Sequence, residues 1–198
     1  MAGWTRHKGQ AVALPIDNID TDQLIPARFM STPRSEGYGR FLLHDQDAAR
    51  AALDAAPGAS ILIAGRNFGS GSSREAAVYA LADAGFRAVI APSFGDIFAG
   101  NAVNNGLCPA RVEDIAPLLR ALETGDKAEI DLEAQIVTLG DTAVPFDIAP
   151  VWKTKLINGW DDIDMTRAYD TQIAAFAAAR PHWTQPKTEP RAGSGADT

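Results

Sequence analysis

Cysteine is almost absent from this chain of 198 residues, which has a single one, Cys108. One cysteine excludes an internal disulfide, and with it the small disulfide-stapled secreted domains, so we expect a cytoplasmic protein. An iron–sulfur cluster is held by several thiolates, so this chain cannot hold one by itself. Histidine is scarce as well: His7, His44 and His182 lie far apart and form no pair with metal-ligand spacing.

Long apolar runs and an excess of basic residues are also missing. No run approaches the roughly 20 apolar residues of a membrane-spanning helix, and residues 1–10 are too polar for a signal peptide, so we expect no membrane partner. The formal net charge is -7. This balance argues against nucleic acid as a partner, because phosphate binding needs a basic face. It does not exclude a small acidic substrate, since one arginine can dominate a pocket.

Short apolar runs alternate with helix-like segments through the middle of the chain. This alternation predicts βαβ units and a partly parallel sheet. The strands are predicted at 11–14, 60–64, 87–91 and 107–112, and the helices at 47–56, 73–84, 94–103 and 115–122. The segment 17–26 is rich in Asp, Asn and Thr, which favour turns and helix caps.

The pattern changes after residue 125. Three short runs at 129–132, 136–139 and 143–146 predict antiparallel hairpins, and an Ala-rich stretch predicts a helix at 166–180. We therefore predict a single α/β domain over residues 1–180, with a mixed sheet, flanking helices and a β-rich C-terminal portion. Residues 181–198 lack periodicity, and we predict a disordered tail there.

The most informative stretch is 67–75, Asn-Phe-Gly-Ser-Gly-Ser-Ser-Arg-Glu, which stands between a predicted strand and a predicted helix. A helix start carries unpaired N–H groups and partial positive charge. Gly69 and Gly71 let a bound group approach the backbone, and Arg74 offers a planar fork for a carboxylate or phosphate. The loop is therefore predicted to hold an anion.

Three interpretations of this loop are open from the residues alone. It is a glycine turn in which Ser72 or Ser73 caps the helix. It is a nucleotide site, which is disfavoured because Gly-Lys-Ser/Thr and a third glycine of the dinucleotide motif are missing. Or it is a carboxylate-substrate site with a serine as acid–base group, although no Asp-His pair stands nearby to activate that serine.

The loop at 67–75 resembles the signature of the small subunits of 3-isopropylmalate dehydratase, the swivelling domain of the aconitase superfamily. The resemblance runs from about residue 14 to residue 178 and implies the β/β/α swivelling fold of aconitase type. Further segments that agree in order and spacing are 20–26, 91–98, 104–107, 131–135 and 158–163.

The resemblance implies the small subunit of a heteromeric hydro-lyase, which isomerises 2-isopropylmalate and 3-isopropylmalate via 2-isopropylmaleate in leucine biosynthesis. It implies a [4Fe-4S] cluster on a separate large subunit, and no cofactor bound by this chain. By position, Ser72 matches the family's catalytic serine, which takes a proton from carbon. Ser73 and Arg74 match residues that bind and orient the diacid substrate.

Three more residues are assigned to substrate binding. Thr21 and Asp22 match a loop that faces the cleft in the family, and Arg28 lies near the loop that contacts the variable group of the substrate. For Arg28, a solvated surface position is an equal alternative.

The chain departs from the family at Ser70, which is usually Cys, at Ala76, which is usually His, and at 151–156. These departures keep two alternatives open. One is a related hydratase for maleate, citraconate, dimethylmaleate or homoaconitate. The other is a non-catalytic anion-binding module.

Overall fold

The structure is a computed structural model that describes residues 2–123 and 127–180. It divides into two compact units, Met1–Asp162 and the part from Ile163 onward, and each is described by itself. The domain boundaries predicted at 1–180 stay a prediction, and the predicted tail at 181–198 lies outside the described residues. No helix of the described residues is long and apolar enough to cross a membrane.

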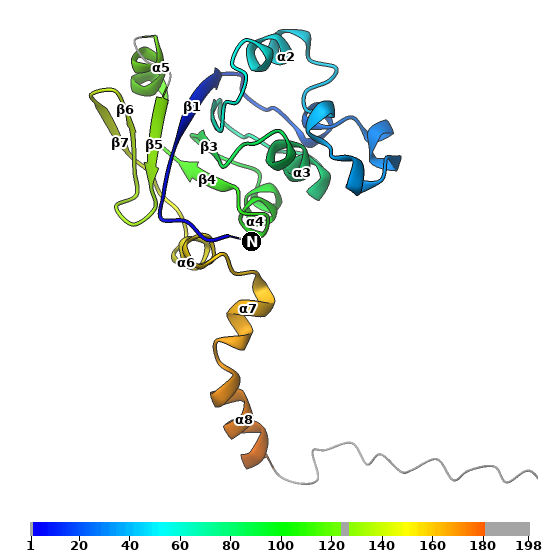
Figure 1. The fold of residues 1–198 in the computed structure, drawn as a ribbon, viewed down its shortest axis with the longest axis vertical. Coiled ribbons are helices and arrows are strands. Elements are labelled where there is room, and N and C mark those ends of the chain that lie inside the picture. The colour runs from blue at the N-terminus through cyan, green and yellow to red at the C-terminus, as the bar shows by residue number, and fades with distance from the viewer. Residues whose placement is uncertain (1, 124–126, 181–198) are drawn as a thin grey trace, which may run out of the picture. The chain divides into compact units, whose positions relative to one another are not determined.

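The first unit is built on a seven-stranded mixed sheet in the order β4-β3-β2-β1-β5-β6-β7 (Figure 1). Strands β1 to β4 are parallel, whereas β1, β5, β6 and β7 pair antiparallel. The predicted α/β class with a β-rich C-terminal portion is thereby confirmed. The bounds are β1 Arg6–Leu14, β2 Ile61–Ala64, β3 Ala88–Ala91, β4 Cys108–Arg111, β5 Lys127–Asp131, β6 Ile136–Leu139 and β7 Thr142–Pro145.

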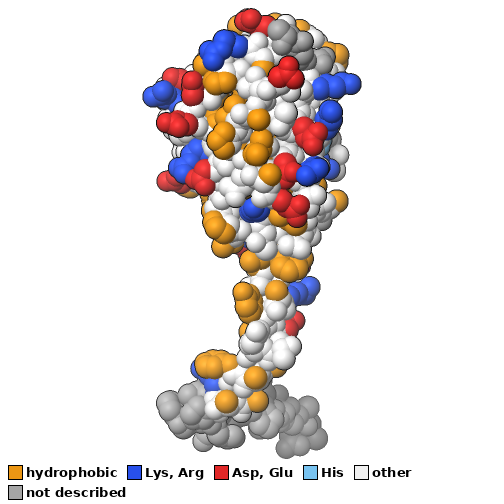
Figure 2. Space-filling view, turned by 90° about the vertical axis from the view of Figure 1, so that its left-hand side faces the viewer, with side chains coloured by type: hydrophobic (Ala, Val, Ile, Leu, Met, Phe, Trp, Pro, Cys, Tyr) orange, Lys and Arg blue, Asp and Glu red, His pale blue; other side chains and the backbone are white. Residues whose placement is uncertain are grey.

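The sheet curls so that its two ends meet. At the end of β4, the Arg111 N–H donates to the carbonyl of Asp147, which follows β7 (3.2 Å), and the Asp147 N–H donates to the Arg111 carbonyl (2.7 Å). Their side chains form an ion pair as well. One apolar core fills the inside of the curl, where β2 contributes Ile61 and Ile63. On the face shown in Figure 2, acidic and basic side chains are interspersed with hydrophobic ones.

A second core lies between the parallel strands and the helices that cover their other face. Leu62 and Ala64 of β2 point into this core, so the strand is buried on both faces, as parallel strands usually are. Helix α3 contributes Leu81 and helix α4 contributes Phe98. The helices of this unit are α1 Thr21–Leu24, α2 Asp47–Asp54, α3 Glu75–Asp83, α4 Asp96–Asn104, α5 Ala116–Leu122 and α6 Pro150–Asn158, and three 3-10 turns lie at Ala27–Ser31, Arg34–Glu36 and Gly39–Phe41.

Three elements differ from the sequence-based expectation. Strand β1 begins at Arg6, because the polar residues before position 11 pair with β5. Helix α6 was not predicted, although proline in its first turn and Gly159 (φ 70°) after its end are standard helix signals. The helix predicted at 166–180 is two helices, α7 Asp162–Arg167 and α8 Asp170–Ala179, separated at Tyr169, where the backbone leaves the helical region.

Candidate active site

Two loops meet at the carboxyl ends of neighbouring parallel strands. One leaves β1 and leads to α1, and the other leaves β2 and leads to α3. An isolated bridge between Asp20 and Ser70 joins them side by side. In open α/β sheets, ligands bind outside the carboxyl ends of the strands, so this edge is where a site is expected. We call the two loops, with residues 20–22 and 69–74, the site edge.

Glycine is required at two points of the second loop. At Gly69 the backbone is left-handed (φ 72°), and a Cβ atom would lie 2.2 Å from the Phe98 ring. The Gly69 N–H also donates to the Ile19 carbonyl (2.7 Å), which ties this loop to the first. At Gly71 the backbone is left-handed too (φ 93°), but a Cβ atom would make only ordinary contacts, 3.5 Å from Asp20 and from Thr21. Gly69 therefore allows close packing, whereas Gly71 provides the turn.

Thr21 fixes the backbone of the predicted catalytic serine. The buried Thr21 hydroxyl donates to the Ser72 carbonyl (3.2 Å), and the Thr21 N–H donates to the Ser70 carbonyl (2.9 Å). A buried hydroxyl with this partner shapes the loop. The side chains of Ser72 and Ser73 are exposed at the surface of this unit.

Arg74 and Asp22 form an ion pair across the two loops. The Arg74 side chain is 23% exposed and that of Asp22 is 54% exposed, so the guanidinium is partly screened from water and the carboxylate is not. The Arg74 N–H donates to the Ser72 carbonyl (2.7 Å). The structure thus brings Thr21, Asp22, Ser72 and Arg74 together from segments about 50 residues apart.

Comparisons with known proteins show the family of this chain. The model of the aconitase C-terminal domain matches residues 1–114. The 3-isopropylmalate dehydratase small subunit of Leuconostoc mesenteroides is 44% identical over 193 residues, covering 92% of this chain and 100% of that one. The small subunit of Geobacillus kaustophilus is 43% identical, covering 89% and 96%. This chain belongs to the 3-isopropylmalate dehydratase small subunits.

A solved structure supports the fold of this small subunit. The 3-isopropylmalate dehydratase of Methanocaldococcus jannaschii matches with a TM-score of 0.66 and 26% identity, covering 86% of this chain and 99% of that one. The predicted family and the aconitase-type swivelling fold are confirmed. The prediction of a hydro-lyase small subunit of leucine biosynthesis is confirmed at the level of the family, and the name of these relatives implies a large-subunit partner.

The small subunit does not use a serine to cap α3, so that interpretation of the loop was wrong. Arg74 occupies the cap position without a side-chain hydrogen bond to the helix, and α3 begins at Glu75. The reason is that the backbone at Arg74 is extended (φ -90°, ψ 103°), which delays the helix. The Glu75 carboxylate accepts a hydrogen bond from Asn105 (2.9 Å), so the helix start is tied to the end of α4.

The capping box of α1, the helix that carries Thr21 and Asp22, was not identified from the sequence. Asp20 caps α1 by accepting the Gln23 N–H (2.8 Å), and the Gln23 side chain accepts the Asp20 N–H (2.9 Å). This capping box stabilises a helix of only four residues. The spacing Asp-x-x-Gln was the signal that could have revealed it.

Arg28 is not brought into this cluster by any contact among the described residues. Its guanidinium donates two hydrogen bonds to Asp45, one of them 2.7 Å long, and lies 4.5 Å from the centre of the Phe29 ring. Hydrogen bonds from Arg28 and His44 hold the pKa of the Asp45 carboxyl well below its usual range. The substrate role of Arg28 stays a prediction.

Of the three departures from the family, Ser70 lies at the site edge and Ala76 lies just after it, whereas 151–156 lies in α6. Ser70 acts through its backbone, which bridges Asp20 and accepts the Thr21 N–H. The contacts made by Ser70 thus depend on its backbone and not on the identity of its side chain. Ala76 is half-buried in the first turn of α3 and offers no acid–base group.

The residues described here do not fit an iron–sulfur cluster. No group of three or more His, Cys, Asp or Glu among them could hold a metal ion. Cys108 is fully buried in β4, and burial raises the pKa of its thiol far above the usual value. A neutral, inaccessible thiol is a poor metal ligand.

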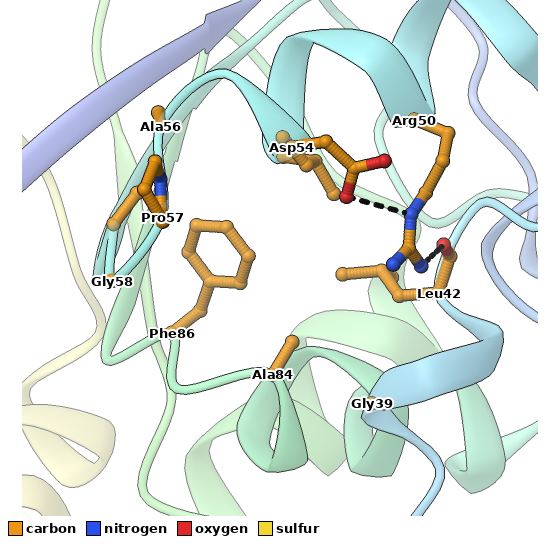
Figure 3. A pocket seen from close by; sticks show the side chains of 11 residues that line it. Gly39, Leu42, Arg50, Asp54, Ala56, Pro57, Gly58, Ala84 and Phe86 are labelled. Atoms are coloured by element: carbon orange, nitrogen blue, oxygen red, sulfur yellow. Dashed lines mark hydrogen bonds and ion pairs between the residues drawn. The ribbon is translucent and has the colours of Figure 1, made fainter.

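A pocket of about 220 Å³ lies near the amino ends of the parallel strands β2 and β3, whereas the site edge lies at carboxyl ends (Figure 3). It opens between α2 and the segments that enter β2 and β3, where Ala59 and Phe86 line it. The Arg50 guanidinium in its wall donates to Asp54 (3.1 Å) and to the Leu42 carbonyl (3.2 Å). Because these polar groups satisfy one another, the pocket has no evident ligand, and it is separate from the site edge.

Proposed function

We propose that this chain supplies half of an active site, in which Ser72 is the base and Arg74 binds a substrate carboxylate. The reaction is the interconversion of 2-isopropylmalate and 3-isopropylmalate through 2-isopropylmaleate, carried out in the cytoplasm. The observation that carries the proposal is the assembly of Thr21, Asp22, Ser72 and Arg74 at the carboxyl ends of parallel strands.

The chemistry needs a base beside a bound carboxylate. Water is eliminated when a proton leaves the carbon next to a carboxylate and hydroxide leaves the neighbouring carbon. Addition of water in the opposite sense gives the isomer, so atoms balance over the cycle. A serine alkoxide is a strong enough base but is costly in water, and the Arg74 guanidinium favours negative charge near it.

The Arg74–Asp22 pair suits a carboxylate-binding role. The guanidinium has five N–H donors, and the ion pair with Asp22 is made through Nη1. Asp22 thereby orients the planar fork, while a substrate carboxylate binds other donors of the same group. Ser73, exposed beside Ser72, is proposed to donate a hydrogen bond to the same diacid.

A partner is required because the proposed base is exposed. A serine alkoxide in contact with bulk water is hydrated and takes a proton from it. The reaction therefore needs a surface that covers the site edge. We propose that the large subunit provides this cover. Because the residues of this chain do not fit an iron–sulfur cluster, the [4Fe-4S] cluster expected for the family is proposed on that subunit.

Anaerobic coexpression with the large subunit tests the proposal. The complex is assayed on a panel of diacids: 2-isopropylmalate, 3-isopropylmalate, maleate, citraconate, dimethylmaleate and homoaconitate. We expect the highest kcat/KM on the isopropylmalates. Preference for another diacid would establish the related-hydratase alternative. The non-catalytic binding module predicts that no stable complex with a cluster-bearing large subunit forms, so copurification of that complex would rule it out.

A further inference from the structure

A long loop starts beside the site edge and returns to its origin. Residues 26–42, here the 26–42 loop, follow α1 and contain three 3-10 turns. At its end the Leu43 N–H donates to the Leu24 carbonyl (3.0 Å), so the two ends of the loop are held together at α1. Loops of this kind depend on side chains for their internal packing. The same helix carries Thr21 and Asp22, so the loop adjoins the site.

The far side of this loop is attached to α3 through one carboxylate. Asp83, the last residue of α3, accepts hydrogen bonds from both terminal nitrogens of Arg34 (2.5 and 2.8 Å). It also accepts the backbone N–H of Tyr38 (2.6 Å). A carboxylate with a bidentate arginine and a backbone donor is a strong, geometrically specific anchor. We call this set of contacts the Asp83 anchor.

Two aromatic rings lie beside the Arg34 guanidinium of the anchor. The Arg34 guanidinium lies 4.4 Å from the centre of the Tyr79 ring and 5.6 Å from that of Tyr38. Tyr38 is buried, and its hydroxyl donates to the Thr32 carbonyl (3.0 Å) within the loop. The rings thus add cation–π attraction to an ion pair in which the Arg34 side chain is 47% exposed and the Asp83 side chain 19% exposed.

The backbone of the loop also lies directly against the end of α3. A Cβ atom on Gly39 would come within 2.6 Å of the Ala84 nitrogen. Only glycine allows this approach without a shift of the backbone. The loop is therefore shaped to fit the place where Asp83 holds it.

Asp83 stands where helix electrostatics disfavour it. The C-terminal end of a helix carries partial negative charge, so a carboxylate in the last turn is locally unfavourable. Such a local conflict is expected where a residue serves another purpose. The other end of the same helix carries Arg74 at its cap position. Helix α3 thus connects the proposed carboxylate-binding residue with the anchor of the loop.

We propose that Asp83 is a positioning residue, which holds the 26–42 loop against α3 and so determines which diacid side chain the site accepts. The effect on substrate choice rests on the proposed function, whereas the anchoring does not. The loop closes beside α1, and its position decides how much room remains next to Thr21 and Asp22. A displaced loop discriminates poorly between an isopropyl and a methyl group, because such discrimination depends on close apolar contacts.

The first test is limited digestion of the full chain with trypsin, which cleaves after Arg28, Arg34 and Arg40 when the loop opens. Cleavage reports the population of the open form. We expect Asp83→Asn to accelerate cleavage in the loop about tenfold, because the ionised acceptor is lost. Asp83→Glu, which keeps the charge, should restore much of the protection. If Asp83→Asn folds poorly, Arg34→Gln breaks the same anchor from its exposed side. This variant lacks the trypsin site at residue 34, so cleavage after Arg28 and Arg40 is compared in all the proteins.

Glu36→Gln is the matched control. Glu36 is a carboxylate in the same loop, but its partner Arg40 belongs to the loop too (2.7 Å). The variant removes one negative charge without touching α3, so we expect cleavage at the wild-type rate. Equal rates of cleavage after Arg28 and Arg40 in Asp83→Asn, Arg34→Gln and wild type would overturn the anchor.

The second test uses the complex with the large subunit. We expect Asp83→Asn to lower the ratio of kcat/KM for 2-isopropylmaleate over citraconate about tenfold, mainly through KM. An unchanged ratio in a variant that trypsin cleaves faster would overturn the link to substrate choice. A wild-type complex inactive on both diacids would overturn the proposed function, while the digestion would still decide on the anchor.

Discussion

Arg74 makes two contacts at the site edge and stands at the start of α3. Its backbone N–H donates to the Ser72 carbonyl, its guanidinium pairs with Asp22, and it marks the point where the loop becomes α3. Its position is thus fixed from two segments of the chain. An arginine held in this way presents its planar fork in one orientation, which is what recognition of a carboxylate demands.

Replacing Arg74 with Lys should reduce kcat/KM of the complex about 10- to 100-fold, because a charge-assisted hydrogen bond worth about 1.5–3 kcal/mol is lost. Arg66→Lys is the control, since Arg66 is exposed in the same loop and lies 3.6 Å from Asp17. Steady-state kinetics with 3-isopropylmalate measures both. Equal losses in the two variants would show that Arg74 has no special relation to the substrate.

His7 gives the stability of the chain a dependence on pH. Partial burial, with a further contribution from the charge of Arg87, lowers the pKa of His7 from its ordinary value of 6.5. At a pH between the folded and the unfolded pKa of His7, the unfolded chain therefore binds more protons at this residue than the folded chain does. The contribution is fully present above pH 6.5 and is lost as the pH falls toward the folded-state pKa.

The urea midpoint of wild type should accordingly decrease between about pH 7.5 and about pH 5.5, and this decrease should be smaller in His7→Gln. His7 is bonded to Ser60 (2.8 Å), so Gln keeps a polar group that reaches the same partner. The same decrease in both proteins would show that His7 does not titrate in this range.

The loop between β2 and α3 depends on glycine for two different physical reasons. Gly69 has both a left-handed backbone and no room for a side chain beside Phe98, whereas Gly71 has only the former constraint. A third glycine, Gly100, lies within α4 and has nothing within 4 Å of the place where its Cβ would be. Substitutions at these three positions therefore distinguish the effect of backbone strain from the effect of steric overlap.

Gly69→Ala should destabilise the chain by about 2–5 kcal/mol, through backbone strain and overlap with the Phe98 ring. Gly100→Ala should stabilise it by about 0.5–1 kcal/mol, because alanine is the better helix former. Thermal unfolding measures both. A neutral Gly69→Ala would show that the site edge is softer than its geometry indicates.

The elements of the parallel half could be predicted because each has its own local signal. Apolar runs marked β2, β3 and β4, and the helices between them begin and end close to the expected residues. The first half of β1 could not be predicted, because its polar residues are specified by pairing with β5. Helix α6 was missed although Pro150 and Gly159 mark its ends.

The site was only partly predictable for a similar reason. The loop with Ser72 and Arg74 has a distinctive composition, so the sequence points to it directly. The pairing of Asp22 with Arg74 and of Arg28 with Asp45 joins residues that are distant in the chain. Such pairs form only when the fold brings the two segments together, so no spacing in the sequence predicts them.

The first unit combines two packed cores with a proposed base that is exposed at its own surface. Both cores are closed within the first unit, so this unit has the packing of an independent domain. The proposed base, by contrast, is exposed at the site edge. This combination is expected of a domain that folds by itself but works only against a second chain.

The purified chain should therefore be colourless and inactive on 3-isopropylmalate, and activity should appear on addition of the large subunit. An absorption spectrum and an anaerobic assay of the isolated chain are sufficient measurements. An iron–sulfur spectrum from this chain alone would contradict the division of the active site between two subunits.

Turnover by the complex carrying Ser72→Ala tests the central claim most directly. We expect the variant to bind the large subunit as wild type does, by size-exclusion chromatography, and to lose at least about 10³-fold in kcat because the base is gone. Ser60→Ala, at the opposite edge of the sheet, should keep its activity. Wild-type-like turnover by the Ser72→Ala complex would contradict the assignment of Ser72 as the base.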